Sequence, residues 1–307
     1  MQESSIRTSK EVDEFPLLRL PLVAREHVLC MMTPFELINV SMTSSKARQA
    51  VTFFSRIKSR FWVGIGIREY PFIDIKESEE FGMAWCYLWT SDPSKIGLTT
   101  DSFSYECIHL FSESKMDDCM KWYESIKGVL GCRIGRACVD NLNASIGAWL
   151  QSQQDSIEDI TILKANGEDV KYFLKTMRVS GNLSLTMSPT NFELEIPESL
   201  TSLSISTAKF INFDQLLRLK AQFIDLEESI LTNQEINRFL KSWMLCESHL
   251  DLKSFKINIS GEEAVNEIMD LPHEVATNGY KIKRSDGKRA NIEFYLWKKP
   301  YLCLLIY

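Results

Sequence analysis

The chain has 307 residues, of which 45% are hydrophobic and 25% are charged. This composition is typical of a globular protein with a core of ordinary size, and it excludes a disordered, collagen-like or membrane-embedded chain as a class. The formal net charge is -6, which argues against a nucleic-acid partner because neutralising a phosphate backbone needs a basic surface.

The first fourteen residues are polar and lack the apolar stretch of a secretory signal. No apolar run approaches the roughly eighteen residues that cross a bilayer. We therefore predict a soluble protein of the cytoplasm and/or nucleus, with no membrane partner. In that reducing environment most of the eight cysteines should be free thiols that pack as small apolar side chains.

A flexible tail, residues 1–14, and three short helices within residues 15–58 are predicted at the N-terminus. The first helix follows Pro21 and covers about 23–32. Thr33 and Pro34 have the pattern of an N-cap followed by proline at the first helical position, and they begin the second helix. The third covers about 44–55. Because about forty residues cannot form a self-sufficient core, these helices should pack either on the rest of the chain or on a partner.

Residues 59–307 are predicted to form an α/β region. Runs rich in aromatic and β-branched residues at 61–67, 71–76 and 81–89 predict a β-meander. A strand at 105–110, a helix at 112–127, a strand at 133–139 and a helix at 143–153 follow.

A repeated spacing of apolar residues begins after Ser156 and extends to about residue 300. Its three copies are Ile157/Ile160/Ile162, Leu200/Leu203/Ile205 and Leu252/Phe255/Ile257. Further strands are predicted at 182–187 and 222–226, and helices at 167–177, 213–219 and 232–245, the last with a capping box of Thr232 and Glu235. This order is typical of leucine-rich-repeat-like strand-helix units. The units are degenerate because no asparagine follows each strand.

The C-terminal residues predict a hairpin and a final strand. The strands are 280–284 and 290–297, joined by a turn at Ser285–Lys288 that contains Asp-Gly, and then 301–306. The predicted fold class is α+β / α/β, with a small N-terminal three-helix domain followed by a β-meander and degenerate leucine-rich-repeat-like units.

The N-terminal helices resemble the F-box motif in the form found in a large nematode family. The resemblance lies in Leu20-Pro21 and, about a dozen residues later, the run Pro34 to Ile38. That family joins its F-box to an F-box-associated domain of the second type, which residues 236–243 and 282–290 resemble. Together the resemblance covers about residues 15–300.

The resemblance implies a non-catalytic substrate-recognition adaptor of a cullin-RING ubiquitin ligase of the Skp-cullin-F-box type. Its F-box helices would bind the Skp-type linker, and through it a cullin, while the C-terminal domain would bind a target protein. The contacts carried over to the linker are Leu20, Pro21, Leu22, Val28, Leu29, Pro34, Phe35, Leu37, Ile38 and Ser41. The third helix departs from the pattern, because Gln49 to Phe53 stand where many F-boxes have a tryptophan.

The alternative is a leucine-rich-repeat-like protein-interaction module without a ligase role, in which the N-terminal helices only cap the repeats. Burial distinguishes the two. Phe35 and Leu37 should be buried in a cap, whereas a docking module should leave part of that apolar surface exposed.

No constellation of catalytic or metal-binding residues is predicted, and no cofactor. The histidines, His27, His109, His249 and His273, have no metal-ligand spacing. Cys132 and Cys138 fit no common redox or metal site. Adjacent carboxylates such as Glu79 and Glu80 do not converge on one substrate.

Two further features bear on target recognition. Lys281, Lys283, Arg284, Lys288 and Arg289 form a basic hairpin that would either contact phosphate or an acidic target segment, or merely keep the hairpin soluble. Trp243 and Trp297 are predicted to lie in the core. Trp85 and Trp89 share a strand face, where burial is favoured over a recognition surface.

Overall fold

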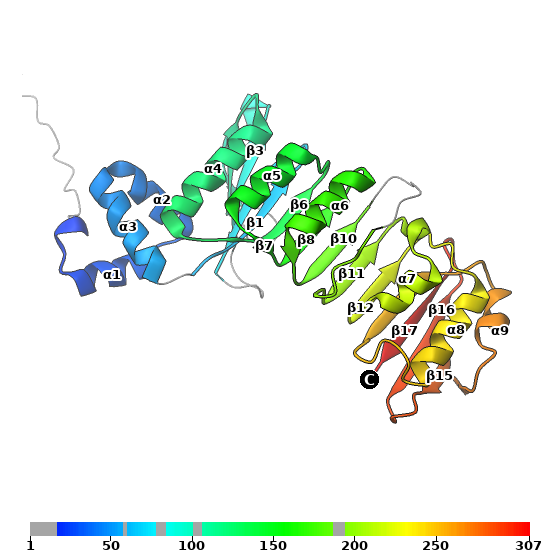
Figure 1. Ribbon diagram of the computed structural model, residues 1–307. Coiled ribbons are helices and arrows are strands. Elements are labelled where there is room, and N and C mark those ends of the chain that lie inside the picture. Colours follow the sequence, from blue (N-terminus) through cyan, green and yellow to red (C-terminus); the bar gives the residue numbers. More distant parts are fainter. Residues whose placement is uncertain (1–16, 58–59, 78–83, 101–105, 187–193) are drawn as a thin grey trace, which may run out of the picture. The chain divides into compact units, whose positions relative to one another are not determined.

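The computed structural model describes residues 17–57, 60–77, 84–100, 106–186 and 194–307, drawn in Figure 1. The predicted tail, residues 1–14, and the first residues of the predicted strand 81–89 lie outside these ranges. The chain divides into two compact units. Unit 1 comprises Met1–Phe61 and Trp122–Cys132, and unit 2 comprises Trp62–Lys121 and Arg133–Tyr307.

Unit 1 contains the three predicted helices, preceded by a short 3-10 turn, Leu17–Arg19. The helices are α1 (Leu22–Met31), α2 (Pro34–Thr43) and α3 (Ser45–Ile57). The predicted start of α2 is confirmed: the Glu36 N–H donates to Thr33 Oγ1 at 3.2 Å, and the Thr33 N–H donates to Glu36 Oε2 at 2.8 Å. This reciprocal box satisfies two donors that a helix start leaves free.

The end of helix α4 (Lys115–Leu130) belongs to unit 1 as well. The Thr52 hydroxyl of α3 donates to the Gly128 carbonyl at 3.4 Å. A Cβ atom at Gly131 would lie 3.7 Å from the Ser55 carbonyl, which is also on α3. Since Tyr123, Ile126, Val129 and Leu130 are buried, a segment distant in sequence supplies core residues to this unit.

Unit 2 is built on one large mixed sheet. In spatial order, its described strands are β14-β15-β16-β17-β13-β12-β11-β10-β8-β6-β1-β2-β3-β5-β4. Their bounds are β1 Trp62–Ile67, β2 Phe72–Lys76, β3 Ala84–Thr90, β4 Gly97–Thr100, β5 Glu106–Phe111, β6 Ile134–Val139, β8 Asp159–Ile162, β10 Asn182–Leu185, β11 Ser202–Ile205, β12 Phe223–Leu226, β13 Ser254–Asn258, β14 Glu274–Ala276, β15 Gly279–Lys283, β16 Arg289–Tyr295 and β17 Tyr301–Ile306. Strands β7 (Ser156–Ile157) and β9 (Arg178–Val179) pair separately. The predicted meander is confirmed as β1, β2 and β3, which pair antiparallel in chain order.

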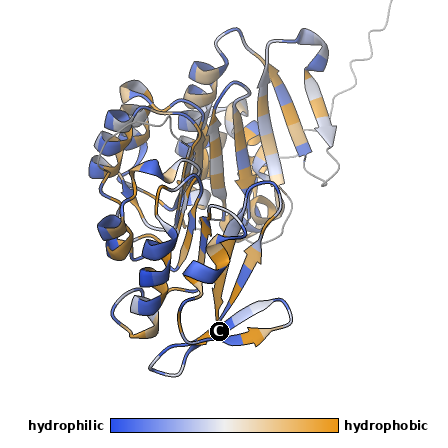
Figure 2. Ribbon diagram, turned by 90° about the vertical axis from the view of Figure 1, so that its right-hand side faces the viewer, coloured by the Kyte–Doolittle hydropathy of each residue, from blue (hydrophilic) through white to orange (hydrophobic). Residues whose placement is uncertain are grey.

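The middle of the sheet is parallel, and its helices lie on one face (Figures 1 and 2). Strands β6, β8, β10, β11, β12 and β13 pair in succession. The helices are α5 Ala144–Gln153, α6 Gly167–Thr176, α7 Phe213–Arg218, α8 Asn233–Met244 and α9 Ala264–Ile268. The predicted repeat positions Ile160, Leu203 and Phe255 are buried. They belong to one continuous row of paired residues across the strands, Ile160, Leu183, Leu203, Ile224 and Phe255.

The opposite face of these strands carries polar and charged side chains. The register places Thr161, Ser184, Ser204, Asp225 and Lys256 side by side on five neighbouring strands. All five are partly exposed. Because successive strand residues point to opposite faces, the apolar row faces the helices and the polar row faces away from them.

Most predicted elements are confirmed within a few residues, but β4, β9, α9 and β14 were not predicted. Each has only two to five residues, which is too short for a clear period in the sequence. The predicted Asp-Gly turn joins β15 to β16: the Arg284 N–H donates to the Lys288 carbonyl at 2.8 Å, and Gly287 has a φ of 100°.

The predictions for the four tryptophans differ in outcome. Trp243, Trp85 and Trp89 are buried. The prediction for Trp297 is wrong, because β16 ends at Tyr295 and Trp297 lies in the following loop with 83% of its surface exposed.

None of the helices in the described ranges is both long enough and apolar enough to span a bilayer.

The buried amide of Asn237 on α8 yields a test of the packing between α8 and α9. Its Nδ2 donates to the carbonyls of Ile268 at 2.9 Å and Asp270 at 3.0 Å. Asn237→Ala removes both donors, so we expect a loss of about 1–3 kcal/mol in the free energy of unfolding. Urea denaturation measures it, with the exposed Gln234→Ala as the control that should change little. An equal effect of the two substitutions would contradict this role.

Candidate functional site

The residues predicted to contact the Skp-type linker divide by exposure. Pro21 is exposed, Leu22 is 52% exposed, and Leu20 and Val28 are partly exposed. The others are buried: Leu29, Pro34, Phe35, Leu37, Ile38 and Ser41. The Ser41 hydroxyl is used internally, because it donates to the Ile38 carbonyl at 2.6 Å.

Phe35 and Leu37, the residues chosen to distinguish a cap from a docking module, are 6% and 0% exposed. This burial is the outcome expected of a cap, so the expectation that a docking module leaves these two side chains exposed is not met. Phe35 and Leu37 are core residues of the isolated chain, and a direct contact with a partner would need them to move. Unit 1 still has large exposed apolar side chains, but they belong to other residues. This set, which we call the exposed apolar set, is Leu18, Leu22, Val23, Met31, Met42, Phe53 and Ile57.

Helix α3 contributes Phe53 and Ile57 to the exposed apolar set, and the sequence prediction did not include either as a contact. The signal was present in their spacing: residues four apart lie on the same helix face. Ala47, Val51 and Phe54 form the buried face of the same helix. The third helix, which lacks the tryptophan of many F-boxes, therefore presents a phenylalanine to solvent instead.

The five cations of the basic hairpin in unit 2 fall into two groups: two that bond to other residues of the chain, and three that form no ion pair within the described ranges. Arg284 is 2% exposed, and its guanidinium donates to both carboxylate oxygens of Asp286, at 2.7 and 3.0 Å, and to the Leu250 carbonyl at 3.0 Å. The Lys288 ammonium also donates to the Leu250 carbonyl, at 3.3 Å. Arg284 is therefore buried in the turn and is not free to bind a target, whereas the Lys288 side chain is exposed and makes a single hydrogen bond to the chain.

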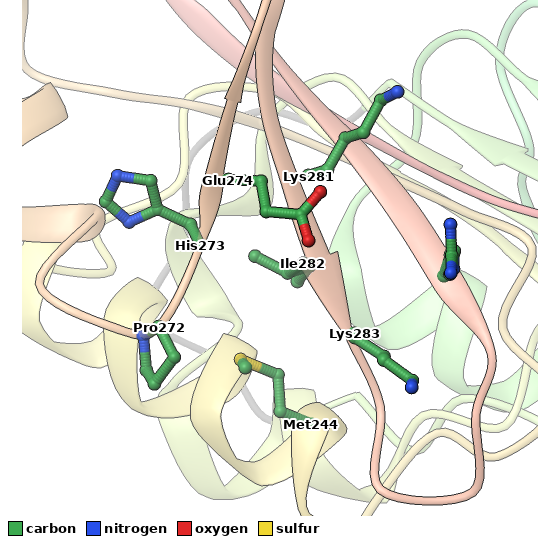
Figure 3. A pocket seen from close by; sticks show the side chains of 8 residues that line it. Met244, Pro272, His273, Glu274, Lys281, Ile282 and Lys283 are labelled. Atoms are coloured by element: carbon green, nitrogen blue, oxygen red, sulfur yellow. The ribbon is translucent and has the colours of Figure 1, made fainter.

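The other three cations, Lys281, Lys283 and Arg289, line a pocket of about 350 Å³ at the edge of the sheet (Figure 3). They form no ion pair with any residue in the described ranges. Met244, at the end of α8, and Ile282 form its apolar wall, and Glu274 is the acidic member of the lining. Lys283 and Arg289 are directly paired across β15 and β16, an arrangement of like charges that opposes pairing of the strands.

Burial shifts the pKa of several candidate reactive groups so that they are uncharged at neutral pH. It raises the pKa of the Cys119 and Cys132 thiols to about 12, so both stay protonated at neutral pH. Burial also lowers the pKa of His249 to about 4, which leaves its ring neutral. Within the described part of the chain, no cluster of three or more His, Cys, Asp or Glu side chains could hold a metal ion.

Comparison with family models gives two matches on different parts of the chain. Residues 17–58, which span α1, α2 and α3, match the model of the F-box domain. Residues 191–257, which include β11, α7, β12 and α8, match the model described as F-box associated. The resembling segment 236–243 falls inside the second match and 282–290 falls outside it. No curated protein and no solved structure matches the chain.

An N-terminal F-box joined to an F-box-associated region defines a class of protein, the substrate adaptors of ubiquitin ligases, which are generally non-catalytic. The chain combines a segment that matches the F-box domain with a segment that matches the F-box-associated domain of the second type. An F-box generally binds a Skp-type linker and thereby a cullin.

The ion pair at the turn of the basic hairpin predicts a pH dependence of stability. The Arg284 side chain beside Asp286 lowers the pKa of that carboxyl to about 2, below the roughly 3.9 expected in an unfolded chain. The stabilising contribution is therefore complete above about pH 4 and is lost as the pH falls towards 2. We expect Asp286→Asn to lower the urea midpoint at pH 7, and the difference from wild type to shrink at pH 2.5. A difference independent of pH would contradict the assignment.

Proposed function

We propose that the protein is the substrate-recognition adaptor of a cullin-RING ligase of the Skp-cullin-F-box type. In this proposal residues 15–58 bind a Skp-type linker, and residues 59–307 bind a target protein. The observation that carries it is the match of residues 17–58 to the F-box domain, and the exposed apolar set supplies surface on those residues for a partner. Large apolar side chains that gather on one small unit are typical of a protein interface.

The energetics favour a hydrophobic contact. Covering one large apolar side chain contributes about 1.5–3 kcal/mol before the costs of association and ordering are subtracted. Several members of the set covered together would therefore sustain a stable complex.

The acidic side chain of Glu36 accepts a hydrogen bond from the Thr33 N–H in the capping box of α2, so its carboxylate already has a partner within the chain.

The proposed contact residues combine prediction and structure. Four of the residues carried over by resemblance are exposed or partly exposed: Leu20, Pro21, Leu22 and Val28. We add Met31, Phe53 and Ile57 from the exposed apolar set. The buried predicted residues, such as Leu37, would act indirectly by fixing the positions of the helices that bear these contacts.

The chain itself performs no chemistry in this proposal, and neither nucleic acid nor a membrane is a partner. The eight cysteines are all free thiols, a state that suits the reducing cytoplasm or nucleus, where we place the complex. Ubiquitin transfer would be carried out by the other subunits.

Binding of the purified full chain to a purified Skp-type linker, measured by isothermal titration calorimetry, tests the proposal. Leu22→Glu together with Phe53→Glu places two charges in the proposed contact, so we expect affinity to fall about a hundredfold or more. Both positions are exposed, with Phe53 at 57%, so the fold should survive.

Tyr172→Glu together with Ile230→Glu is the matched control, since both are exposed apolar residues of unit 2. This pair should bind like wild type. Absence of binding by a folded wild-type chain, or equal binding by both double variants, would favour an interaction protein without a ligase role.

A further inference from the structure

The end of β16 and the loop that follows it expose three consecutive apolar residues. Tyr295, Leu296 and Trp297 are all exposed, and Trp297 is the most exposed of them. A tryptophan side chain can bury on the order of 200 Å² of surface, but most of the Trp297 side chain is exposed to solvent. Tryptophan is also the residue type most enriched where interfaces concentrate their binding energy.

The chain holds this loop in a defined conformation. The Lys299 N–H donates to the Trp297 carbonyl at 2.8 Å, and the Ile259 N–H donates to the Pro300 carbonyl at 3.0 Å. The rings of Tyr295 and Tyr301 stack at 4.6 Å between centroids and close the base of the loop. Lys298 has a φ of 58°, a left-handed conformation that is unfavourable for a residue with a side chain. Trp297 is thus presented outward by its neighbours.

A pocket of about 760 Å³ adjoins Trp297. It lies where the parallel strands β12 and β13 end, and the carboxyl ends of parallel strands are where α/β sheets commonly bind ligands. The apolar part of its lining is Leu226, Ile259, Trp297, Pro300 and Tyr301. This size and this character suit an apolar side chain of a ligand together with the residues on either side of it.

The three acidic groups of the lining share two cationic partners, Lys256 and Lys209. Lys256 Nζ lies 2.9 Å from an Asp225 oxygen and 3.5 Å from a Glu227 oxygen. Glu228 lies 3.7 Å from Lys209 Nζ.

The two lysines next to Trp297 differ from these groups. Lys298 and Lys299 line the same pocket, and they form no ion pair with any residue of the described chain. With Lys209 counted, four lysines stand against three carboxylates, so the pocket and its ion-pair partners carry a formal excess of one positive charge, located at Lys298 and Lys299. The protein as a whole carries a formal charge of -6. An acidic ligand complements this local charge.

We propose that this pocket, which we call the Trp297 pocket, binds a short acidic segment of a partner protein. An apolar side chain of the segment packs against Trp297 and Tyr301, and Asp or Glu residues beside it pair with Lys298 and Lys299. The interpretation of that partner as the target for ubiquitination rests on the proposed function, whereas binding itself needs unit 2 alone.

The probe is a positional-scanning library of immobilised decapeptides, incubated with the purified full chain without any Skp-type linker. We expect Asp and Glu to be enriched on either side of one apolar position, and Lys and Arg to be depleted there. The best-binding peptide, labelled with fluorescein, then gives a dissociation constant by fluorescence anisotropy.

Three variants locate the binding. Trp297→Ala, and Lys298→Glu together with Lys299→Glu, should each weaken binding of that peptide by about tenfold or more. Lys281→Glu together with Lys283→Glu is the matched control: it makes the same charge change in the other basic pocket and should leave binding within about twofold. Circular dichroism confirms that each variant is folded.

The proposal is overturned by a library with no enrichment, by enrichment of basic residues, or by a loss of binding confined to the Lys281 and Lys283 variant. Titration of the same preparations with the Skp-type linker keeps the two proposals apart. Linker binding without peptide selection would contradict the Trp297 pocket alone, and peptide selection without linker binding would contradict the ligase role alone.

Discussion

The row of apolar side chains that crosses the parallel strands is the constraint on which unit 2 depends. Ile160, Leu183, Leu203, Ile224 and Phe255 stand in register on five neighbouring strands and are all buried. Because side chains alternate along a strand, a shift of one residue would turn this row away from the helices. The same register therefore places the polar row, from Thr161 to Lys256, on the face without helices, and it sets where each strand ends. The Trp297 pocket is formed at those ends, by the last residues of β12 and β13 together with the loop that carries Trp297.

Unit 1 satisfies a different constraint, since a few short helices cannot bury their own apolar surface. Part of that surface is covered by residues 122–132, whose Gly128 and Gly131 come close to Thr52 and Ser55 on α3. The rest stays exposed, as Leu22 and Phe53 show. Packing on the chain thus accounts for one face of these helices, and in our proposal the linker covers the face that stays exposed.

The sequence predicted the elements well where a period repeats and poorly where tertiary contacts decide. Caps such as Thr33 and Thr232 and the spacing of Leu203 and Ile205 gave helices and strands within a few residues of their observed bounds. The sequence left the burial of Phe35 open, because the apolar faces of a short helix can pack either on the chain or on a partner. The sequence prediction placed Trp297 in the core because it extended the second strand of the hairpin two residues too far. Strand alternation would in any case put Trp297 on the face opposite Ile292, away from the core. In the basic hairpin, Arg284 is bound within the chain and Lys283 is not. This difference depends on Asp286 and Leu250, which only the folded chain brings together.

The central claim is that the chain docks to its linker through unit 1 and leaves unit 2 free for a target. Hydrogen–deuterium exchange of the full chain, with and without a saturating Skp-type linker, tests this most directly. The account predicts slower exchange within residues 17–57 on adding the linker and no change within residues 279–306. Unchanged exchange throughout unit 1, or protection confined to the sheet of unit 2, would contradict it.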